Sequence, residues 1–393
     1  MQYTLTRTAV HTHAAQLLTY HLQLTDFSAT CPARMLLAVL FAAAAHLSSI
    51  FAIACWLLAV ASAETIRKAL QAALPGQDEL QTRLNRALVA GLPDALRRRP
   101  QRVAVDLTLV PYHGRPLHDP EEIYRSQAKH GTTHFHAYAT VYVVYRGRRF
   151  TLALTVVERG MDLDGVLRWL LWQAGRAGVR TRLVLLDRGF CSVAVIRYLQ
   201  AARRPFLMPL VCRGRGLGHP HGPSGSQVFR ARKRSGWDRY TMTSTAGQRA
   251  TVGVCIACDN QRGRRGRHGR RTLVYAYWGL EPSSPSWVRQ TYRERFGIET
   301  SYRQMNQARI RTCTRDPQVR LLYVGLALVL RNVWVHLHDA VLSSPRRGRR
   351  VIRLERLRFK TLLAWLLHVA ESEWGVYDCT GCERPVEPAL TGS

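Results

Sequence analysis

Apolar residues recur along the chain with two different periods, and the change between them marks a first boundary. Residues 1–99 carry apolar positions at helical spacing and end in the basic, Pro-terminated stretch LPDALRRRP. RVAVDLTLVPYHG (102–114) then predicts a strand, and 134–160 predicts two more strands joined at Arg146-Gly147-Arg148. A helical N-terminal region therefore precedes a region that begins with strands.

A helix and a further strand follow. The apolar positions of 161–179 have helical spacing, and Asp162 or Asp164 could cap the start of that helix. TRLVLLDRGF (181–190) predicts a short strand that ends at Asp187, before the helix CSVAVIRYLQAA. This order of elements is typical of an α/β fold, in which the first strand and the strand ending at Asp187 can be neighbours.

The second half of the chain is first rich in strands and then helical. Short strands and basic loops occupy 205–282, and helix resumes over 287–310. Two more apolar helices are predicted around 319–342 and 354–374, separated by PRRGRR (345–350). No internal repeat is visible.

The stretch from Met35 to Ala63 contains no Asp, Glu, Lys or Arg, and by length alone it is a candidate membrane span. It is also rich in Ala, contains His46 and is interrupted at Ser48-Ser49, where a serine N-cap would divide it into two shorter helices. We expect a buried pair of helices here and no membrane partner.

The net charge of the chain indicates the kind of partner that it binds. The chain has 57 Lys and Arg against 26 Asp and Glu, a net charge of +31, which is typical of a protein that binds nucleic acid. Most of the excess is arginine, whose forked guanidinium matches phosphate oxygens. A GC-rich genome would explain the preference for Arg over Lys but not the net excess, so we expect a polyanionic partner.

Nine cysteines in 393 residues do not make a disulfide scaffold. Two CxxC pairs, Cys255/Cys258 and Cys379/Cys382, could be halves of one zinc site. Cys255 lies in the apolar run ATVGVCIACD, which predicts a strand, so we favour a buried thiol over a zinc ligand.

Three carboxylates stand out by their context. Asp106 interrupts an apolar strand, where an acid is costly unless it is paired or bound to a cation. Asp187 ends a strand, at the position where ligand sites of open α/β sheets gather. Glu299 lies in the predicted helix YRERFGIETSYRQMNQ, on the face that also carries Tyr292, Arg295, Arg303 and Asn306.

If the two strands are neighbours and the helix crosses their ends, the three acids converge. Such an oxygen site suits Mg²⁺ or Mn²⁺. Each acid also has an ordinary structural role open to it. Asp106 could cap a strand end, Asp187 could form a turn, and Glu299 could pair with the arginines one turn away, worth about 0.3–0.5 kcal/mol per pair.

The ordered motifs VDLTLVPYHG, LLDRGF and YRERFGIETSYR resemble the DDE transposases of bacterial and archaeal insertion sequences. More narrowly, Tyr292, Arg295 and Glu299 match the Tyr-x2-Arg-x3-Glu signature of one group. That group has a Lys seven positions after the Glu, where this chain has Asn306, and Arg303 or Arg309 can substitute for it. The resemblance covers roughly residues 100–340.

The resemblance implies a ribonuclease-H-like α/β core, a mixed sheet flanked by helices, with a β-rich insertion and an all-α N-terminal domain. It divides the chain into a helical end-binding domain, the first part of the core, the insertion, the last part of the core and a C-terminal helical segment. These regions are 1–99, 100–204, 205–282, 283–342 and 343–393.

The resemblance also implies the chemistry. Members cut DNA at transposon ends and join the 3′-hydroxyls to target DNA by two-metal-ion phosphoryl transfer, usually as a dimer on paired ends. Asp106, Asp187 and Glu299 would be the catalytic residues and would hold two Mg²⁺ or Mn²⁺ ions. The expected location is the prokaryotic cytoplasm, at the nucleoid.

Other residues are expected to contact DNA: Tyr292, Arg295, Arg303, Lys129 and Arg188. Lys129 lies in SQAKHGTTHFH, which we interpret as a loop and strand facing DNA rather than a metal site. The arginine-rich runs 262–271 and 346–350 are further candidates for phosphate contacts.

Two alternatives remain open from the sequence. The chain could be a non-catalytic DNA-binding protein derived from a transposase, although such a protein has no reason to retain three costly acids. It could also be a metal-dependent nuclease on the same core, which inverted repeats flanking the gene would argue against.

Overall fold

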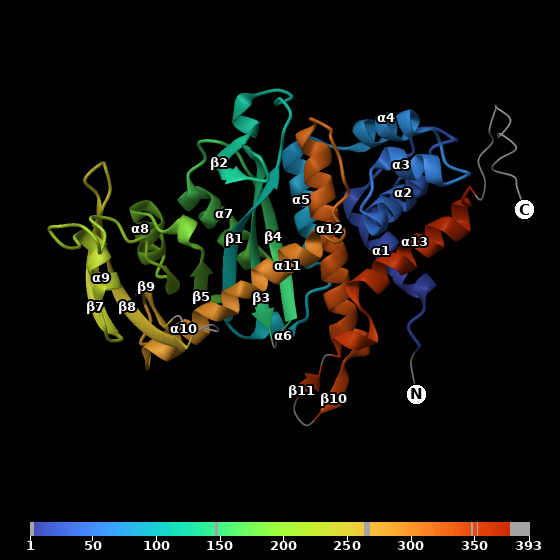
Figure 1. The fold of residues 1–393 in the computed structure, drawn as a ribbon. Helices are drawn as coiled ribbons and strands as arrows, with labels where there is room; N and C mark the ends of the chain where they lie inside the picture. Colours follow the sequence, from blue (N-terminus) through green and yellow to red (C-terminus); the bar gives the residue numbers. More distant parts are fainter. Residues whose placement is uncertain (1–3, 146–147, 263–267, 347–348, 352, 378–393) are drawn as a thin grey trace, which may run out of the picture.

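The computed structural model describes residues 4–145, 148–262, 268–346, 349–351 and 353–377. The molecule is elongated, with the strands of residues 236–278 at one end and the N-terminal helices at the other (Figure 1). The N-terminal helices are α1 (Arg7–Leu22), α2 (Ala33–His46), α3 (Ile50–Trp56), α4 (Ala63–Ala73), α5 (Gln77–Val89) and α6 (Ala95–Arg98). The helical prediction for residues 1–99 agrees with this part of the structure.

The apolar stretch 35–63 is divided where the sequence indicated. Ser49 is the N-cap of α3, and its hydroxyl accepts a hydrogen bond from the Ala52 N–H at 3.1 Å. Helix α2 is buried along most of its length, but α3 exposes Phe51 and Trp56, so the expectation of a fully buried pair is wrong for α3. The two helices are bent by 105° relative to one another.

Nine strands form one sheet in the order β2-β3-β1-β5-β6-β9-β8-β7, with β4 also paired to β3. Strand β1 is parallel to β5 and β5 is parallel to β6, and the other pairs are antiparallel. The strands are β1 (Gln101–Pro111), β2 (Tyr124–Lys129), β3 (Thr132–Tyr145), β4 (Arg148–Val157), β5 (Thr181–Leu186), β6 (Phe206–Pro209), β7 (Gly236–Thr243), β8 (Arg249–Arg262) and β9 (His268–Trp278). A separate two-stranded sheet contains β10 (Ser344–Arg346) and β11 (Arg349–Val351).

The segment 205–282 is rich in strands, but it does not form a sheet of its own. Its first strand, β6, is parallel to β5, and β9 pairs with β6, so β9, β8 and β7 continue the sheet that starts with β2 and β3. Backbone hydrogen bonds thus connect the segment to the strands that carry the acids. The domain boundaries stay predictions.

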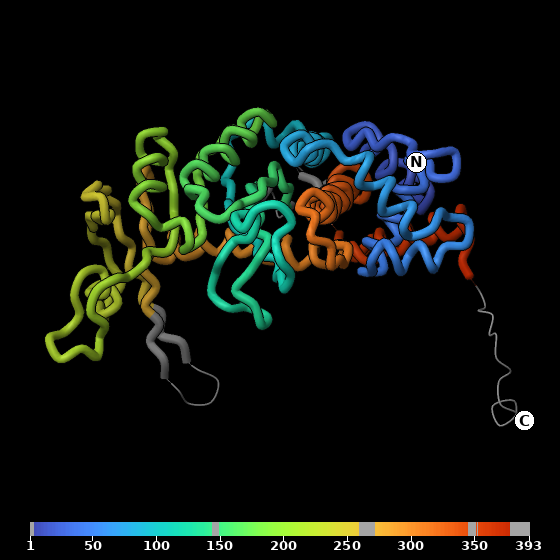
Figure 2. The backbone as a smooth tube through the Cα atoms, turned by 90° about the horizontal axis from the view of Figure 1, so that it is seen from above, coloured from blue at the N-terminus to red at the C-terminus, as the bar shows by residue number. Residues whose placement is uncertain are grey.

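Helices cover both faces of the sheet. Helices α7 (Leu163–Arg176) and α8 (Val193–Ala201) lie on one side, and α10 (Pro285–Arg293) and α11 (Gly297–Met305) lie on the other (Figure 2). Alternation along the strands explains this arrangement, because Val103 and Val105 join the main apolar core while Ala104 joins the cluster that contains Tyr292 and Ile298. Ala104 therefore lies on the face that α10 and α11 cover.

The single helix predicted over 287–310 is interrupted. A 3₁₀ turn, Glu294–Phe296, separates α10 from α11. The Tyr142 hydroxyl, on β3, donates to the carbonyls of Arg295 at 2.9 Å and Glu294 at 3.2 Å. The Arg102 side chain pairs with the Glu294 carboxylate. The turn is therefore held by the sheet beneath it.

Helix α12 (Pro317–Leu337) lies between the N-terminal helices and the sheet (Figure 1). Gly325 allows its close approach to α5, because a Cβ there would lie 2.5 Å from the buried Leu84. The segment Pro317–Leu342 is long and apolar enough to cross a membrane, but 94% of its most apolar window is already covered by the rest of the chain. Helix α13 (Phe359–Trp374) packs on α1 and α2.

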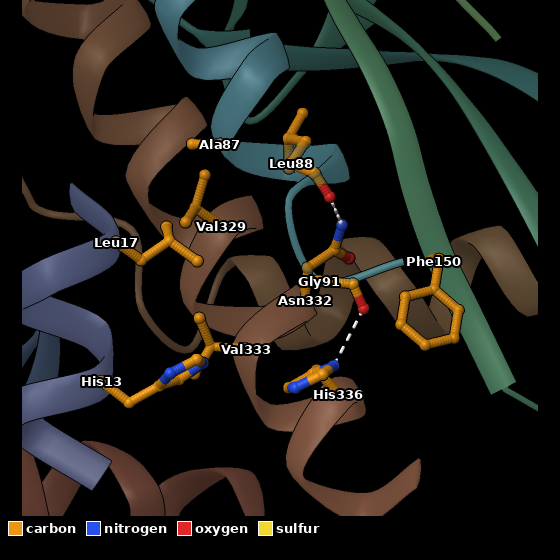
Figure 3. A pocket seen from close by; sticks show the side chains of 10 residues that line it. All are labelled: His13, Leu17, Ala87, Leu88, Gly91, Phe150, Val329, Asn332, Val333 and His336. Atoms are coloured by element: carbon orange, nitrogen blue, oxygen red, sulfur yellow. Dashed lines mark hydrogen bonds between the residues drawn. The ribbon is translucent and has the colours of Figure 1, made fainter. Parts of the chain in front are cut away.

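Figure 3 shows side chains of α12 between residues of α1 and α5 and Phe150 on β4. The Asn332 amide donates to the carbonyls of Leu88, at the end of α5, and Thr151, on β4. One turn later, the His336 ring lies 2.9 Å from the Gly91 carbonyl and stacks on His13 from α1. The N-terminal helices are thus packed against the sheet through α12 and also directly through α5, whose Asn85 side chain hydrogen-bonds to the backbone of Leu154 on β4.

Candidate active site

Asp106 and Asp187 are placed side by side by the register of two parallel strands. Val105 on β1 pairs with Leu186 on β5, and each acid directly follows one member of that pair. The prediction that these strands are neighbours is confirmed. Asp106 is 9% exposed, whereas Asp187 lies just past the end of its strand with its side chain 39% exposed.

Asp106 is held by the chain around it. Its Oδ1 accepts the Leu107 N–H at 2.9 Å, and its Oδ2 accepts from Arg295 Nη1 at 3.1 Å. Burial raises the pKa of this carboxyl to about 6, the Arg295 charge opposes the shift, and the Asp187 charge adds to it. Burial is the largest effect, so the charged form of Asp106 needs a nearby cation.

Arg295 is that cation in this structure, and it contacts all three acids. Its Nη2 lies 3.0 Å from Asp187 Oδ1 and 3.8 Å from Glu299 Oε1, in addition to the contact with Asp106. The contact with Asp106 is a charge-assisted hydrogen bond, and the contacts with Asp187 and Glu299 are ion pairs. The predicted convergence of Asp106, Asp187 and Glu299 is therefore present, with a guanidinium among them.

Two tyrosines fasten the helices to the strands that carry the acids. The Tyr292 hydroxyl, on α10, donates to the Leu186 carbonyl at 3.2 Å. The Tyr302 hydroxyl, on α11, lies 3.1 Å from the Asp106 carbonyl, to which it donates, and 2.7 Å from the Thr140 hydroxyl. Each tyrosine thus positions its helix against the backbone at or next to a catalytic candidate.

Sequence reasoning did not identify Thr140 or Tyr302. Tyr302 follows Glu299 by three residues, which places it on the same helix face and was a usable signal. Thr140 could not be found in that way, because it is one of several alternating residues in β3 and only the register Asp106↔Thr140 distinguishes it.

Of the five residues predicted to contact DNA, Arg295 and Tyr292 are buried and the other three are exposed. Arg295 is 5% exposed and Tyr292 is 3% exposed, and both are occupied by the contacts described above. Neither side chain is therefore exposed to DNA in this structure, and their contact with DNA stays a prediction. Arg303 on α11 and Arg188 after Asp187 are exposed, and Lys129 is exposed next to the turn between β2 and β3.

The three acids are chemically suited to divalent metal ions, but in this structure their carboxylates are paired with Arg295. Within the part of the chain that the structure describes, no group of three His, Cys, Asp or Glu side chains could hold a metal ion. Instead, the Arg295 guanidinium lies among Asp106, Asp187 and Glu299 and forms ion pairs with all three. Carboxylate oxygens are the ligands that Mg²⁺ and Mn²⁺ prefer, so binding requires the guanidinium to give up its ion pairs.

The cysteines give no support to a zinc site. Cys255 is buried in β8, and burial raises the pKa of its thiol to about 12, which disfavours the thiolate that zinc would need. Cys258 is half-buried in the same strand. Cys379 and Cys382 lie outside the described residues.

Comparison with known proteins identifies a family and a similar fold. A family model for the transposase DDE domain matches residues 97–333, a range that contains all three acids. A solved structure described as "Cryo-EM structure of piggyBac transposase synaptic complex with hairpin DNA (SNHP)" superposes with a TM-score of 0.51 at 11% identity, covering 93% of this chain and 78% of that chain. At this identity the second match concerns the fold alone. No curated protein matches the chain.

Proposed function

This chain belongs to the transposase DDE domain family, and on that premise we propose that it cuts DNA at the ends of an insertion sequence and joins the 3′-hydroxyls to target DNA. The observation that carries the proposal is the meeting of Asp106, Asp187 and Glu299 around one guanidinium. Two parallel strands and a helix bring three acids together, and their negative charges require a nearby cation.

Asp106, Asp187 and Glu299 would hold the divalent metal ions that this family generally uses. Two such ions, when bound, would supply Lewis acids for the attacking and leaving oxygens of phosphoryl transfer. The chain itself contributes the rigid placement of the ligands, since Tyr302 and the Leu107 N–H fix Asp106 from two sides. Glu299, 48% exposed in its side chain, is the acid most open to incoming DNA.

Arg295 would have two roles in succession. Without metal, it neutralises part of the charge of the three acids and keeps them together. Once released from those ion pairs, its fork can bind a phosphate oxygen. Its Nε is buried and has no hydrogen-bond partner among the described residues, so the guanidinium is not fully satisfied where it lies.

DNA is the proposed partner, contacted by the exposed side chains of Arg303, Arg188 and Lys129. The net charge of +31 supports this partner. The similar solved structure is a transposase synaptic complex with hairpin DNA, which supports a paired-end assembly of this chain too. We propose a homodimer in that assembly, acting on the nucleoid of a prokaryotic cytoplasm.

Cleavage of DNA that carries the sequences flanking the gene tests the proposal. The wild type is compared with Glu299→Gln and with Glu281→Gln, which removes an exposed acid outside the triad. We expect nicking in Mg²⁺ or Mn²⁺ at the repeat ends by the wild type and by Glu281→Gln only, with DNA binding retained by all three.

The other outcomes identify the alternatives. Cutting by Glu299→Gln at the wild-type rate would remove Glu299 from the site. Cutting without any strand joining would indicate a nuclease. Tight, salt-sensitive binding with no cutting by any of the three proteins would indicate a non-catalytic DNA-binding protein.

A further inference from the structure

A cluster of buried positive charge lies on the same face of the sheet as Asp106, further along β1. The register pairs Asp106 with Thr140, Thr108 with Tyr138 and Val110 with His136. Because side chains alternate along a strand, these alternate positions share the face that carries Asp106. At about 3.3 Å per residue, Tyr138 lies roughly 7 Å from Asp106 along the strand and His136 roughly 13 Å.

Two arginines reach this part of the face from the segment that follows α11. Arg309 and Arg320 both line a small cavity together with Tyr138 and Thr312. Arg320, on α12, is 6% exposed, donates from Nε to the Thr314 carbonyl at 2.7 Å and lies over the Tyr112 ring at 4.6 Å. Arg309 is half-buried and donates from Nε to Asn306 Oδ1 at 3.3 Å.

Neither guanidinium is paired with an acid. The ion pairs between described residues include Arg295 with three carboxylates, but none involves Arg309 or Arg320. Burial lowers the pKa of both arginines, partly offset by the facing Tyr138 hydroxyl, and for Arg309 the charge of Arg320 adds to the lowering. A buried cation without a counter-charge is costly, and Arg320 shares its cavity with a second, half-buried cation, Arg309.

His136 adds a second unsatisfied group. Its ring packs edge-on against Tyr112, the same ring that Arg320 covers. It is 5% exposed, and its Nε2 has no hydrogen-bond partner among the described residues. Buried polar groups are normally paired, so this ring nitrogen is an unsatisfied group next to the ring that Arg320 covers.

We propose that Arg309 and Arg320 form a phosphate-binding site that takes a backbone phosphate of the DNA strand held at the three acids. Phosphates follow one another at about 3.4 Å along the axis of a DNA strand, so this site would bind a phosphate about two to four nucleotides from the reacting bond. The inference rests on the proposed function for the identity of the strand. It assigns DNA phosphate binding to these two arginines, separate from the metal binding proposed for the three acids.

The size of the cavity sets where the phosphate binds. Its volume of about 10 Å³ admits one water at most, so a phosphate group would lie at its mouth beside Arg309 and not inside it. Arg320, which is buried, would then attract the phosphate through its charge without touching it, and would keep its contact with the Tyr112 ring. Arg309→Gln is therefore the more direct test, and it also leaves the deeply buried Arg320 in place.

The experiment measures binding of a short labelled DNA duplex by the full chain over a range of KCl concentrations, without metal. Each phosphate contact that is lost should reduce the slope of log K against log salt by about 0.9. We expect Arg309→Gln to show this reduction and roughly tenfold weaker binding at low salt. Arg309→Lys should keep most of the slope.

Arg176→Gln is the matched control, because Arg176 is an exposed arginine at the end of α7, on the opposite face of the sheet (Figure 2). It should keep the wild-type slope. Equal slopes for Arg309→Gln and the wild type, or equal reductions in Arg309→Gln and Arg176→Gln, would overturn the inference. Arg320→Gln should behave like Arg309→Gln, and if it fails to fold the Arg309 variants decide the matter.

Inorganic phosphate separates a DNA site from a site for a free anion. Phosphate should raise the Tm of the wild type more than that of Arg309→Gln. If phosphate protects only the wild type while the DNA slopes are equal, the pair binds a free anion and the DNA site is excluded. None of these measurements requires cleavage, so this inference and the proposed function can fail independently.

Discussion

Arg295 Nη1 lies 3.1 Å from Asp106 Oδ2, and this contact joins a helical segment late in the chain to its first strand. The same guanidinium reaches Asp187 through Nη2. Arg295 thus places a positive charge next to carboxylates whose charged forms require one. Metal ions at the three acids, as proposed, would compete with the Arg295 ion pairs.

Arg295→Gln should bind Mn²⁺ more tightly than the wild type in the absence of DNA. A unit charge about 4 Å from another contributes roughly 4 kcal/mol at an effective dielectric constant of 20, so tightening of tenfold or more is expected after relaxation. Electron paramagnetic resonance of free Mn²⁺ measures the affinity directly. Arg295→Lys, which keeps the charge, should stay near the wild type, and equal Mn²⁺ affinity in all three proteins would show that the guanidinium does not compete.

Asp106→Asn should change stability in a manner that depends on pH. The pKa of Asp106 is raised from 3.8 to about 6 by burial, so the folded state binds more protons than the unfolded state between those values. The wild type therefore loses stability as pH rises through about 4 to 6, by an amount on the order of 3 kcal/mol at ~1.36 kcal/mol per pH unit.

The asparagine variant lacks this loss. The unfolding free energy of Asp106→Asn minus that of the wild type should therefore be larger at pH 7 than at pH 4.5. Urea denaturation at the two pH values measures the difference. The same difference in unfolding free energy at both values would contradict the raised pKa.

Tyr302→Phe should loosen α11 from β1. It removes the hydrogen bond to the Asp106 carbonyl and the contact with the Thr140 hydroxyl, which together should cost about 1–3 kcal/mol in unfolding free energy. Because Glu299 is on the same helix, cleavage should fall while DNA binding stays. In a double-mutant cycle with Thr140→Val the two changes should be coupled, and simple additivity would argue against the shared hydrogen bond.

Asn332→Ala should weaken the connection between the N-terminal helices and the sheet. It leaves the Leu88 and Thr151 carbonyls, and the Thr151 N–H that Oδ1 accepts, without their partner in a buried position. The expected cost is about 2–4 kcal/mol. Thermal unfolding measures it, and limited proteolysis should cut near residue 91 sooner. Unchanged thermal unfolding and proteolysis would show that these bonds do not hold the interface.

The sequence by itself determined much of this protein. Period-two and helical patterns located β1, β5, α7 and α8, and Ser49 was recognisable as a helix cap. An acid inside an apolar strand and another at a strand end are costly wherever the chain folds, so Asp106 and Asp187 could be singled out before any contact was known. These properties depend on residues close together in sequence.

Only the tertiary structure decided how those parts meet. The helix predicted over 287–310 is interrupted because Tyr142 and Arg102, far away in sequence, hold the turn at Glu294. Arg295 turns inward because two strands place acids beneath it, and β9 extends the sheet because β6 offers it a free edge. Local patterns contain only the preferences of neighbouring residues, whereas these outcomes depend on hydrogen-bond partners and charges brought together by long-range strand pairing.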